Sequence, residues 1–131
     1  MKRWTIAALL AALAMPALAH HSIAVHYDQA TSMTVDGVVT QYLWRNPHVF
    51  IYLEVTDEAG SIQNWVLQWQ NTQVLRWRGL GPESIQPGER LTVSGSPERH
   101  EPQRLWITDV ERQPDGVIFE ATDEERYLLV P

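Results

Sequence analysis

No cysteine occurs in this chain of 131 residues, so neither disulfide bonds nor thiolate metal sites are available. Any bound metal must therefore be held by nitrogen and oxygen ligands. The chain also lacks a glycine-rich phosphate loop and a His-Glu-x-x-His helix, and Ser22 beside His21 is too local to form a triad. These absences argue against an enzyme, except that an amino-terminal histidine can host oxidative copper chemistry.

Basic residues are scarce. The chain has 10 lysines and arginines against 16 acidic residues, which gives a formal charge of −6. The single lysine, Lys2, and its neighbour Arg3 lie at the very start, and without them the formal charge becomes −8. A negative field of this kind repels phosphate backbones, so we expect no nucleic-acid partner.

The first nineteen residues have the pattern of a secretory signal peptide. Lys2 and Arg3 precede the apolar run WTIAALLAALAM, and Ala17-Leu18-Ala19 offers small side chains for cleavage after Ala19. A membrane anchor needs about 20 uninterrupted apolar residues, and Pro16 ends this run sooner. We therefore expect export to the periplasm and no membrane span in the mature form, with release from the cell left open.

The mature chain has the length of one domain, which we place at residues 20–120, followed by an acidic tail at 121–131. Residues 32–112 have mainly the period of strands. In the first strand, Gly37 stands where a strand would bulge or bend. Its apolar face is predicted to comprise Met33, Val35, Val39 and Leu43.

The next two strands follow the breaker Arg45-Asn46-Pro47 and the turn DEAG. The run HVFIYLEV alternates, so His48, Phe50, Tyr52 and Glu54 share one face. The opposite face is predicted to comprise Val49, Ile51, Leu53 and Val55. In SIQNWVLQW, the aromatic and aliphatic face is predicted to comprise Trp65, Leu67 and Trp69. These patterns predict a three-stranded antiparallel meander.

A short helix and two more strands complete the expected order. Asn71 is a candidate helix N-cap and Gly79 a candidate C-terminal glycine. Pro87-Gly88 suits a type II turn that leads into a strand at 91–94, and RLWITDVER supplies another strand. This is the order of a five-stranded OB-like barrel with one short helix between strands 3 and 4. An open sandwich is the alternative.

Several motifs accompany this pattern: AHHS, YD, GVVTQYLWRNPHVFIYLEV, the pair Asn64-Trp65, RGL and IQPGERLTVSG. Together they resemble the exported domain-of-unknown-function family 6152 over about residues 19–110. The His-His-Ser start and the Trp-x-Asn-Pro-His hairpin are matched residue by residue at 20–22 and at 44–48. The glycine-rich segment usual in such proteins is replaced here by VLQWQNTQ. The resemblance implies an exported OB-like domain and no particular activity.

Two adjacent histidines follow the expected cleavage site. If cleavage leaves His20 first, its free amine has a pKa near 8 and can bind a metal together with the ring. A further histidine nitrogen would complete a planar set suited to copper. His48 is the main candidate to supply this further nitrogen, and His21 and His26 are the other candidates. If residues 22–27 paired back along the first strand, about 17 Å would still separate His20 from the hairpin.

Structural explanations compete with each of these assignments. His48 in RNPH can simply hydrogen-bond a turn carbonyl. The aromatic stripe on the second strand is either covered by the amino-terminal segment or used for recognition. The alternative function is therefore a non-enzymatic OB-type binding or scaffolding domain for a peptide, glycan or envelope protein. Its candidate ligand-binding residues are Trp44, Asn46, Phe50, Tyr52 and Asn64.

Overall fold

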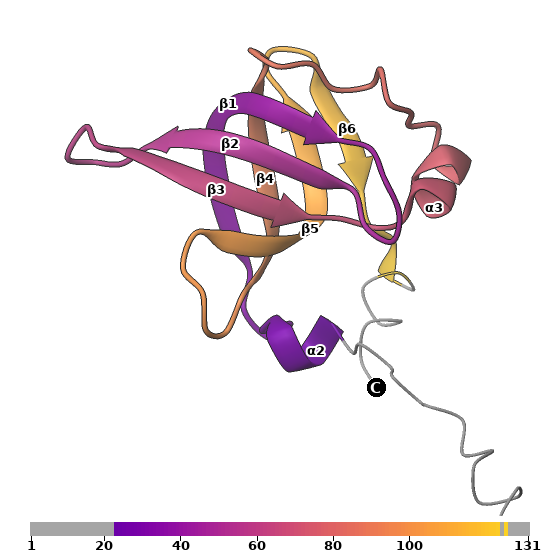
Figure 1. Cartoon of the computed structure of the whole chain (residues 1–131), viewed down its shortest axis with the longest axis horizontal. Coiled ribbons are helices and arrows are strands. Elements are labelled where there is room, and N and C mark those ends of the chain that lie inside the picture. Colours follow the sequence, from indigo (N-terminus) through magenta and orange to yellow (C-terminus); the bar gives the residue numbers. More distant parts are fainter. Residues whose placement is uncertain (1–22, 124, 126–131) are drawn as a thin grey trace, which may run out of the picture.

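In the computed structural model, which describes residues 23–123 and 125, the chain forms a small β-barrel flanked by two short helices (Figure 1). The elements in chain order are α2 (Ile23–His26), β1 (Met33–Leu43), β2 (Phe50–Thr56), β3 (Ile62–Gln68), α3 (Thr72–Trp77), β4 (Arg90–Pro97), β5 (Arg104–Arg112) and β6 (Gly116–Glu120).

The strands follow the spatial order β3-β2-β1-β4-β5-β6, and each neighbouring pair is antiparallel. A parallel pairing between β3 and β5 closes the barrel, with Val66–Gln68 alongside Arg104–Trp106. A meander, a helix and two further strands is the arrangement of an OB fold, so the fold predicted from the sequence is confirmed. The sixth strand, β6, was not predicted, and it extends the sheet beyond β5.

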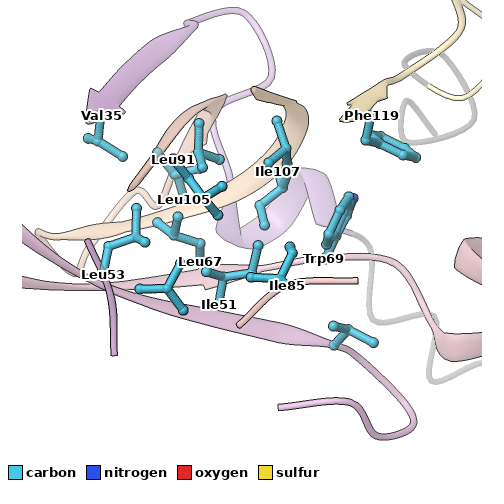
Figure 2. Close-up of a cluster of buried hydrophobic side chains, with 14 of the residues drawn as sticks. Val35, Ile51, Leu53, Leu67, Trp69, Ile85, Leu91, Leu105, Ile107 and Phe119 are labelled. Atoms are coloured by element: carbon cyan, nitrogen blue, oxygen red, sulfur yellow. The ribbon is translucent and has the colours of Figure 1, made fainter. Parts of the chain in front are cut away.

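The barrel interior is filled by aliphatic side chains from β1 to β5 together with Trp69 and Phe119 (Figure 2). On β2 and just before it, Val49, Ile51 and Leu53 are buried, as their alternation predicts. Leu67 and Trp69 face the same interior from β3 and the residue after it. The rings of Trp69 and Phe119 meet edge to face with centroids 4.9 Å apart, so β6 closes one end of this core.

β1 is the strand that bends to join the two halves of the barrel. Its first half pairs with β4 and its second half with β2, and Val38 pairs with both. Gly37 lies at this bend because a Cβ there would come within 2.6 Å of the carbonyl oxygen of Glu54. The register shift itself falls later, between Val39 and Gln41.

This bulge corrects the predicted face of β1. Met33, which precedes the bulge, is 39 % exposed at the start of β1. Leu43, which follows the bulge, is only half-buried, although it was placed on the apolar face. One extra residue reverses the alternation, so after the bulge Tyr42 and Trp44 pack against the core instead.

The helix α3 begins and ends where the sequence predicts. The side chain of Asn71 accepts hydrogen bonds from the backbone N–H groups of Gln73 and Val74, at 3.0 and 2.9 Å. Gly79 adopts the left-handed conformation just beyond the helix, with φ of 81°. Leu75 is fully buried and anchors this short helix in the core, whereas Trp77 is 75 % exposed.

The segment before β1 does not pair back along that strand as supposed. Residues 23–26 form α2, and Tyr27 makes a β-bridge with Glu98 in the loop between β4 and β5. A turn from Asp28 to Thr31 follows, with the N–H of Thr31 donating to the carbonyl of Asp28 at 3.2 Å. The segment formed by residues 23–27, called the amino-terminal segment below, therefore lies toward the β4–β5 loop. No helix within the described part of the chain is long and apolar enough to cross a membrane.

Tyr42 provides a test of the packing after the bulge. Its hydroxyl is buried without a hydrogen-bond partner among the described residues, and burial raises its pKa well above the usual value of 10.0. The unfolded chain therefore loses this proton first as the pH rises, and stability should fall above about pH 10. We expect Tyr42→Phe to stabilise the protein by about 1 kcal/mol and to flatten this alkaline decline. Urea unfolding between pH 7 and 11 measures both effects, and an unchanged alkaline slope would contradict the assignment.

Candidate functional site

A cavity of about 510 Å³ lies outside the barrel core, where the amino-terminal segment meets the barrel wall. Four separate parts of the chain line it: α2 with Tyr27, the β1–β2 loop, the end of β3, and the β4–β5 loop with the start of β5. Figure 1 shows α2 beside the β4–β5 loop at this end of the barrel. The lining residues are Ile23, His26, Tyr27, Pro47, His48, Gln68, Glu98, Glu101 and Arg104.

His48 reaches the cavity from the β1–β2 loop and is held by Trp69, the residue that follows β3. Its Nδ1 lies 3.2 Å from the carbonyl oxygen of Trp69. Because a carbonyl only accepts hydrogen bonds, Nδ1 carries the proton, and in the neutral ring Nε2 carries the lone pair. The hydrogen bond expected from RNPH is present, but its carbonyl lies beyond β3 rather than in the hairpin turn.

A cluster of aromatic rings lies beside the cavity. The ring of Trp106, 1 % exposed, meets His48 edge to face at a centroid distance of 5.5 Å and Tyr27 at 6.0 Å. The Tyr27 hydroxyl donates to Oε1 of Gln68 at 2.9 Å, and burial of this hydroxyl raises its pKa. Tyr27 and Trp106 are buried outside the main core cluster, so they form a second, smaller core beneath the amino-terminal segment.

Arg99 ties α2 to the β4–β5 loop. Its backbone N–H donates to the carbonyl of His26 at 2.8 Å, and its Nε donates to the carbonyl of Ala24 at 3.3 Å. The guanidinium also lies 3.5 Å from Oδ1 of Asp28. In addition, the N–H of Asp28 donates to the carbonyl of Pro97 at 2.8 Å. These contacts hold His26 against the β4–β5 loop.

The charged side chains of the cavity come from the β4–β5 loop and β5. Arg104 is paired with Glu101, with Nε 2.8 Å from Oε2. The carboxylate of Glu98 accepts hydrogen bonds from the backbone N–H groups of His100, at 2.9 Å, and Glu101. Burial raises the pKa of Glu98, but these two N–H groups and the nearby His100 and His26 together lower it by more, so the net pKa lies below its usual value. Glu98 is therefore ionised at neutral pH.

The structure brings two of the four predicted metal ligands, His26 and His48, to the same cavity. The other two, His20 and His21, lie outside the described residues. Within residues 23–123 and 125, no group of three or more His, Cys, Asp or Glu side chains is arranged to hold a metal ion by itself.

The five predicted ligand-binding residues are divided between different parts of the barrel. Phe50 and Tyr52 lie side by side on the outer face of β2 with centroids 6.4 Å apart, and Asn64 is exposed on β3. Trp44 instead packs against the core with the Arg76 guanidinium over its ring. The side chain of Asn46 accepts from the N–H and hydroxyl of Thr72, at 3.1 and 2.8 Å, and so connects the β1–β2 loop to α3.

The sequence analysis did not select the other lining residues, Ile23, Tyr27, Pro47, Gln68, Glu98, Glu101 and Arg104, or Trp106 beside them. One signal was available. Leu105, Trp106 and Ile107 form an unbroken apolar run in a strand that otherwise faces water on one side. Such a run indicates that both faces of the strand are covered at that point.

The comparisons with known proteins give a family. The family described as "Family of unknown function (DUF6152)" matches residues 7–104. No curated protein matches the chain significantly.

Two groups of solved structures share part of the fold. The mitochondrial single-stranded DNA binding protein Rim1 from S. cerevisiae is 11 % identical, with a TM-score of 0.48, over 66 % of this chain and 96 % of that one. A chain of the yeast Stn1 and Ten1 structure is 19 % identical, with a TM-score of 0.47, over 65 % of this chain and 44 % of that one. At these identities the similarity extends to the arrangement of the strands and no further.

Proposed function

The chain belongs to DUF6152, a family of unknown function, and we propose that it is a small periplasmic copper-binding module that uses its mature amino-terminal histidine. In this proposal the chain is exported and cleaved after Ala19. The amine and ring of His20 then bind one copper ion together with histidines of the cavity. The protein is not an enzyme in this proposal.

The hydrogen bond between His48 and the carbonyl of Trp69 carries the proposal. Histidines that bind metals usually donate their second ring N–H to a carbonyl or carboxylate, which fixes the tautomer and the orientation of the ring. His48 has this arrangement, with Nδ1 3.2 Å from the carbonyl oxygen. The edge-to-face contact with Trp106 further restricts the ring. This arrangement supports the proposal that His48 binds the metal through Nε2.

The position of the amino-terminal segment supports the same site. Ile23 lines the cavity and follows His20 by three residues, a length of chain that spans at most about 11 Å. In this proposal the mature terminus at His20 lies within that length of Ile23, which lines the same cavity as His48 and His26. Since the described residues do not supply three ligands of their own, the terminal amine and ring of His20 complete the set. Nitrogen ligands in a tetragonal arrangement favour copper.

The experiment that tests this function compares two forms of the protein. One begins at His20, and the other carries a single glycine before His20, which moves the free amine away from the ring. We expect the first form to bind one Cu²⁺ and the second to bind it at least 100-fold more weakly. Isothermal titration calorimetry measures the affinity, and electron paramagnetic resonance reports the nitrogen ligands. Equal affinity in both forms would exclude chelation by the amine and ring of His20. Mass spectrometry of the exported protein checks whether the mature chain begins at His20.

A second candidate function, recognition of a peptide or glycan, is favoured by the outer face of β2. Phe50 and Tyr52 are both partly exposed there, and the Arg45 guanidinium lies 5.8 Å from the centroid of the Phe50 ring. In this case the double variant Phe50→Ala, Tyr52→Ala should lose binding on peptide and glycan arrays and retain its copper content. An array without any hit for the unmodified protein would argue against recognition by this face.

A further inference from the structure

The volume of the cavity exceeds what a metal ion requires. An ion with a full shell of six waters needs roughly 180 Å³, because each water occupies about 30 Å³. The cavity measures about 510 Å³, which falls within the range of sites for small organic molecules. Space for such a molecule therefore remains even when copper is bound.

We infer that this cavity binds a small organic cation, namely a protonated amine with an apolar or aromatic body. The inference does not depend on copper binding, because it rests only on residues of the described cavity.

The charges of the cavity lining select for a cation. Arg104 is the only permanently positive group among the lining residues, and its pairing with Glu101 at 2.8 Å offsets its charge. Glu98 forms no ion pair within residues 23–123 and 125. With neutral histidines the lining has a net charge of −1, and this charge resides on Glu98. An anionic ligand would be repelled by this carboxylate, and the arginine of the lining is already paired with Glu101.

Glu98 is also held in place before any ligand arrives. Two backbone N–H groups of the β4–β5 loop donate to its carboxylate, and its own N–H donates to the carbonyl of Arg104 at 3.1 Å. Its pKa lies below the usual value, so the group stays charged. A carboxylate that is already oriented loses little side-chain entropy when an ammonium group binds to it.

The remaining lining suits the body of the ligand. Ile23 and Pro47 supply apolar surface from two different segments. The ring of Tyr27 is fixed by its contact with Trp106 and by the hydrogen bond to Gln68. An aromatic ring near a carboxylate favours an organic cation, because the face of the ring attracts positive charge.

The test uses three probes of similar size that differ in charge: 2-phenylethylamine, 2-phenylethanol and 3-phenylpropionate. Each is titrated into the metal-free protein in the presence of EDTA, and binding is measured by calorimetry and by NMR shifts of cavity residues. We expect the amine to bind at least tenfold more tightly than the alcohol and the acid. Equal binding of all three, preference for the acid, or shifts of residues elsewhere on the barrel would overturn the inference.

Two variants that change the charge of the cavity in opposite directions extend the test. Glu98→Gln keeps a side-chain acceptor for the loop N–H groups and removes the charge, so it should weaken amine binding at least tenfold. Arg104→Gln leaves Glu101 unpaired and should strengthen amine binding. The matched control is Glu111→Gln, at an exposed position on β5 outside the cavity, and it should change nothing. If Glu98→Gln does not fold, an unchanged or weaker affinity in Arg104→Gln would still contradict the inference.

The copper titration distinguishes failure of this inference from failure of the proposed function. Amine binding without copper binding would leave the cavity site standing and remove the metal site. Copper binding to the form that starts at His20, without any selective amine binding, would support the metal site and exclude the amine site.

Discussion

Gly95→Ala is expected to destabilise the barrel by about 3 kcal/mol, the upper end of what overpacking usually costs. A Cβ on Gly95 would lie 2.0 Å from the carbonyl oxygen of Trp106 and 2.7 Å from Cδ1 of Leu105. The carbonyl belongs to the backbone of β5, so β4 and β5 must move apart to make room. This position also lies at the register shift between Ser94 and Gly95, where the two strands approach closely. Urea and thermal unfolding measure the loss.

The matched control for this prediction is Gly81→Ala. Nothing lies within 4 Å of a Cβ on Gly81, and its φ is not positive, so we expect stability to stay within about 0.5 kcal/mol of the unmodified protein. If Gly95→Ala were as stable as Gly81→Ala, the close contact between β4 and β5 would be wrong. Because Trp106 packs against Tyr27 and His48, which line the cavity, the spacing of these strands affects the site as well as the barrel.

His48→Asn is expected to lower copper affinity at least about 100-fold, more than the loss of an outer hydrogen-bond partner usually costs. Asparagine places an N–H donor near the position of Nδ1, so the bond to the carbonyl of Trp69 can persist. It has no counterpart of Nε2. The variant therefore separates the structural role of the residue from its proposed role as a ligand. Calorimetry gives the affinity, and circular dichroism with thermal unfolding reports the fold.

His100→Asn is the control for this experiment. His100 is exposed in the same loop as Glu98 and does not line the cavity, so its replacement should leave copper affinity unchanged. Unchanged copper affinity in His48→Asn would exclude His48 as a ligand. A fall of similar size in His100→Asn would show that copper binds outside the cavity.

Local patterns predicted the elements wherever short-range chemistry dominates. The alternation of Val49, Ile51 and Leu53 follows from the two-residue period of a strand, and all three are buried. Asn71 and Gly79 mark the ends of α3 because their side-chain chemistry and conformational freedom satisfy a helix terminus. The order of these elements was sufficient to predict the barrel.

Local patterns predicted the wrong face for the end of β1, where one extra residue changes its pairing register with β2. The bulge between Val39 and Gln41 places Tyr42 and Trp44 against the core, and it moves Leu43 off the face predicted for it. A bulge depends on how β1 must curve to pair with both β2 and β4, and no short stretch of β1 contains that requirement. Trp44 therefore does not belong to the predicted recognition face.

The sequence by itself determined the strand alternation, the helix ends, the absence of thiolate ligands and the histidines available to a metal. Only the tertiary structure decided that His26 and His48 share one cavity with Glu98, which forms no ion pair within the described part of the chain. The physical reason is that the cavity depends on contacts between distant segments, such as Tyr27 with Trp106 and Arg99 with His26. Periodicity specifies which side of a strand is apolar, but these contacts exist only after the barrel has closed.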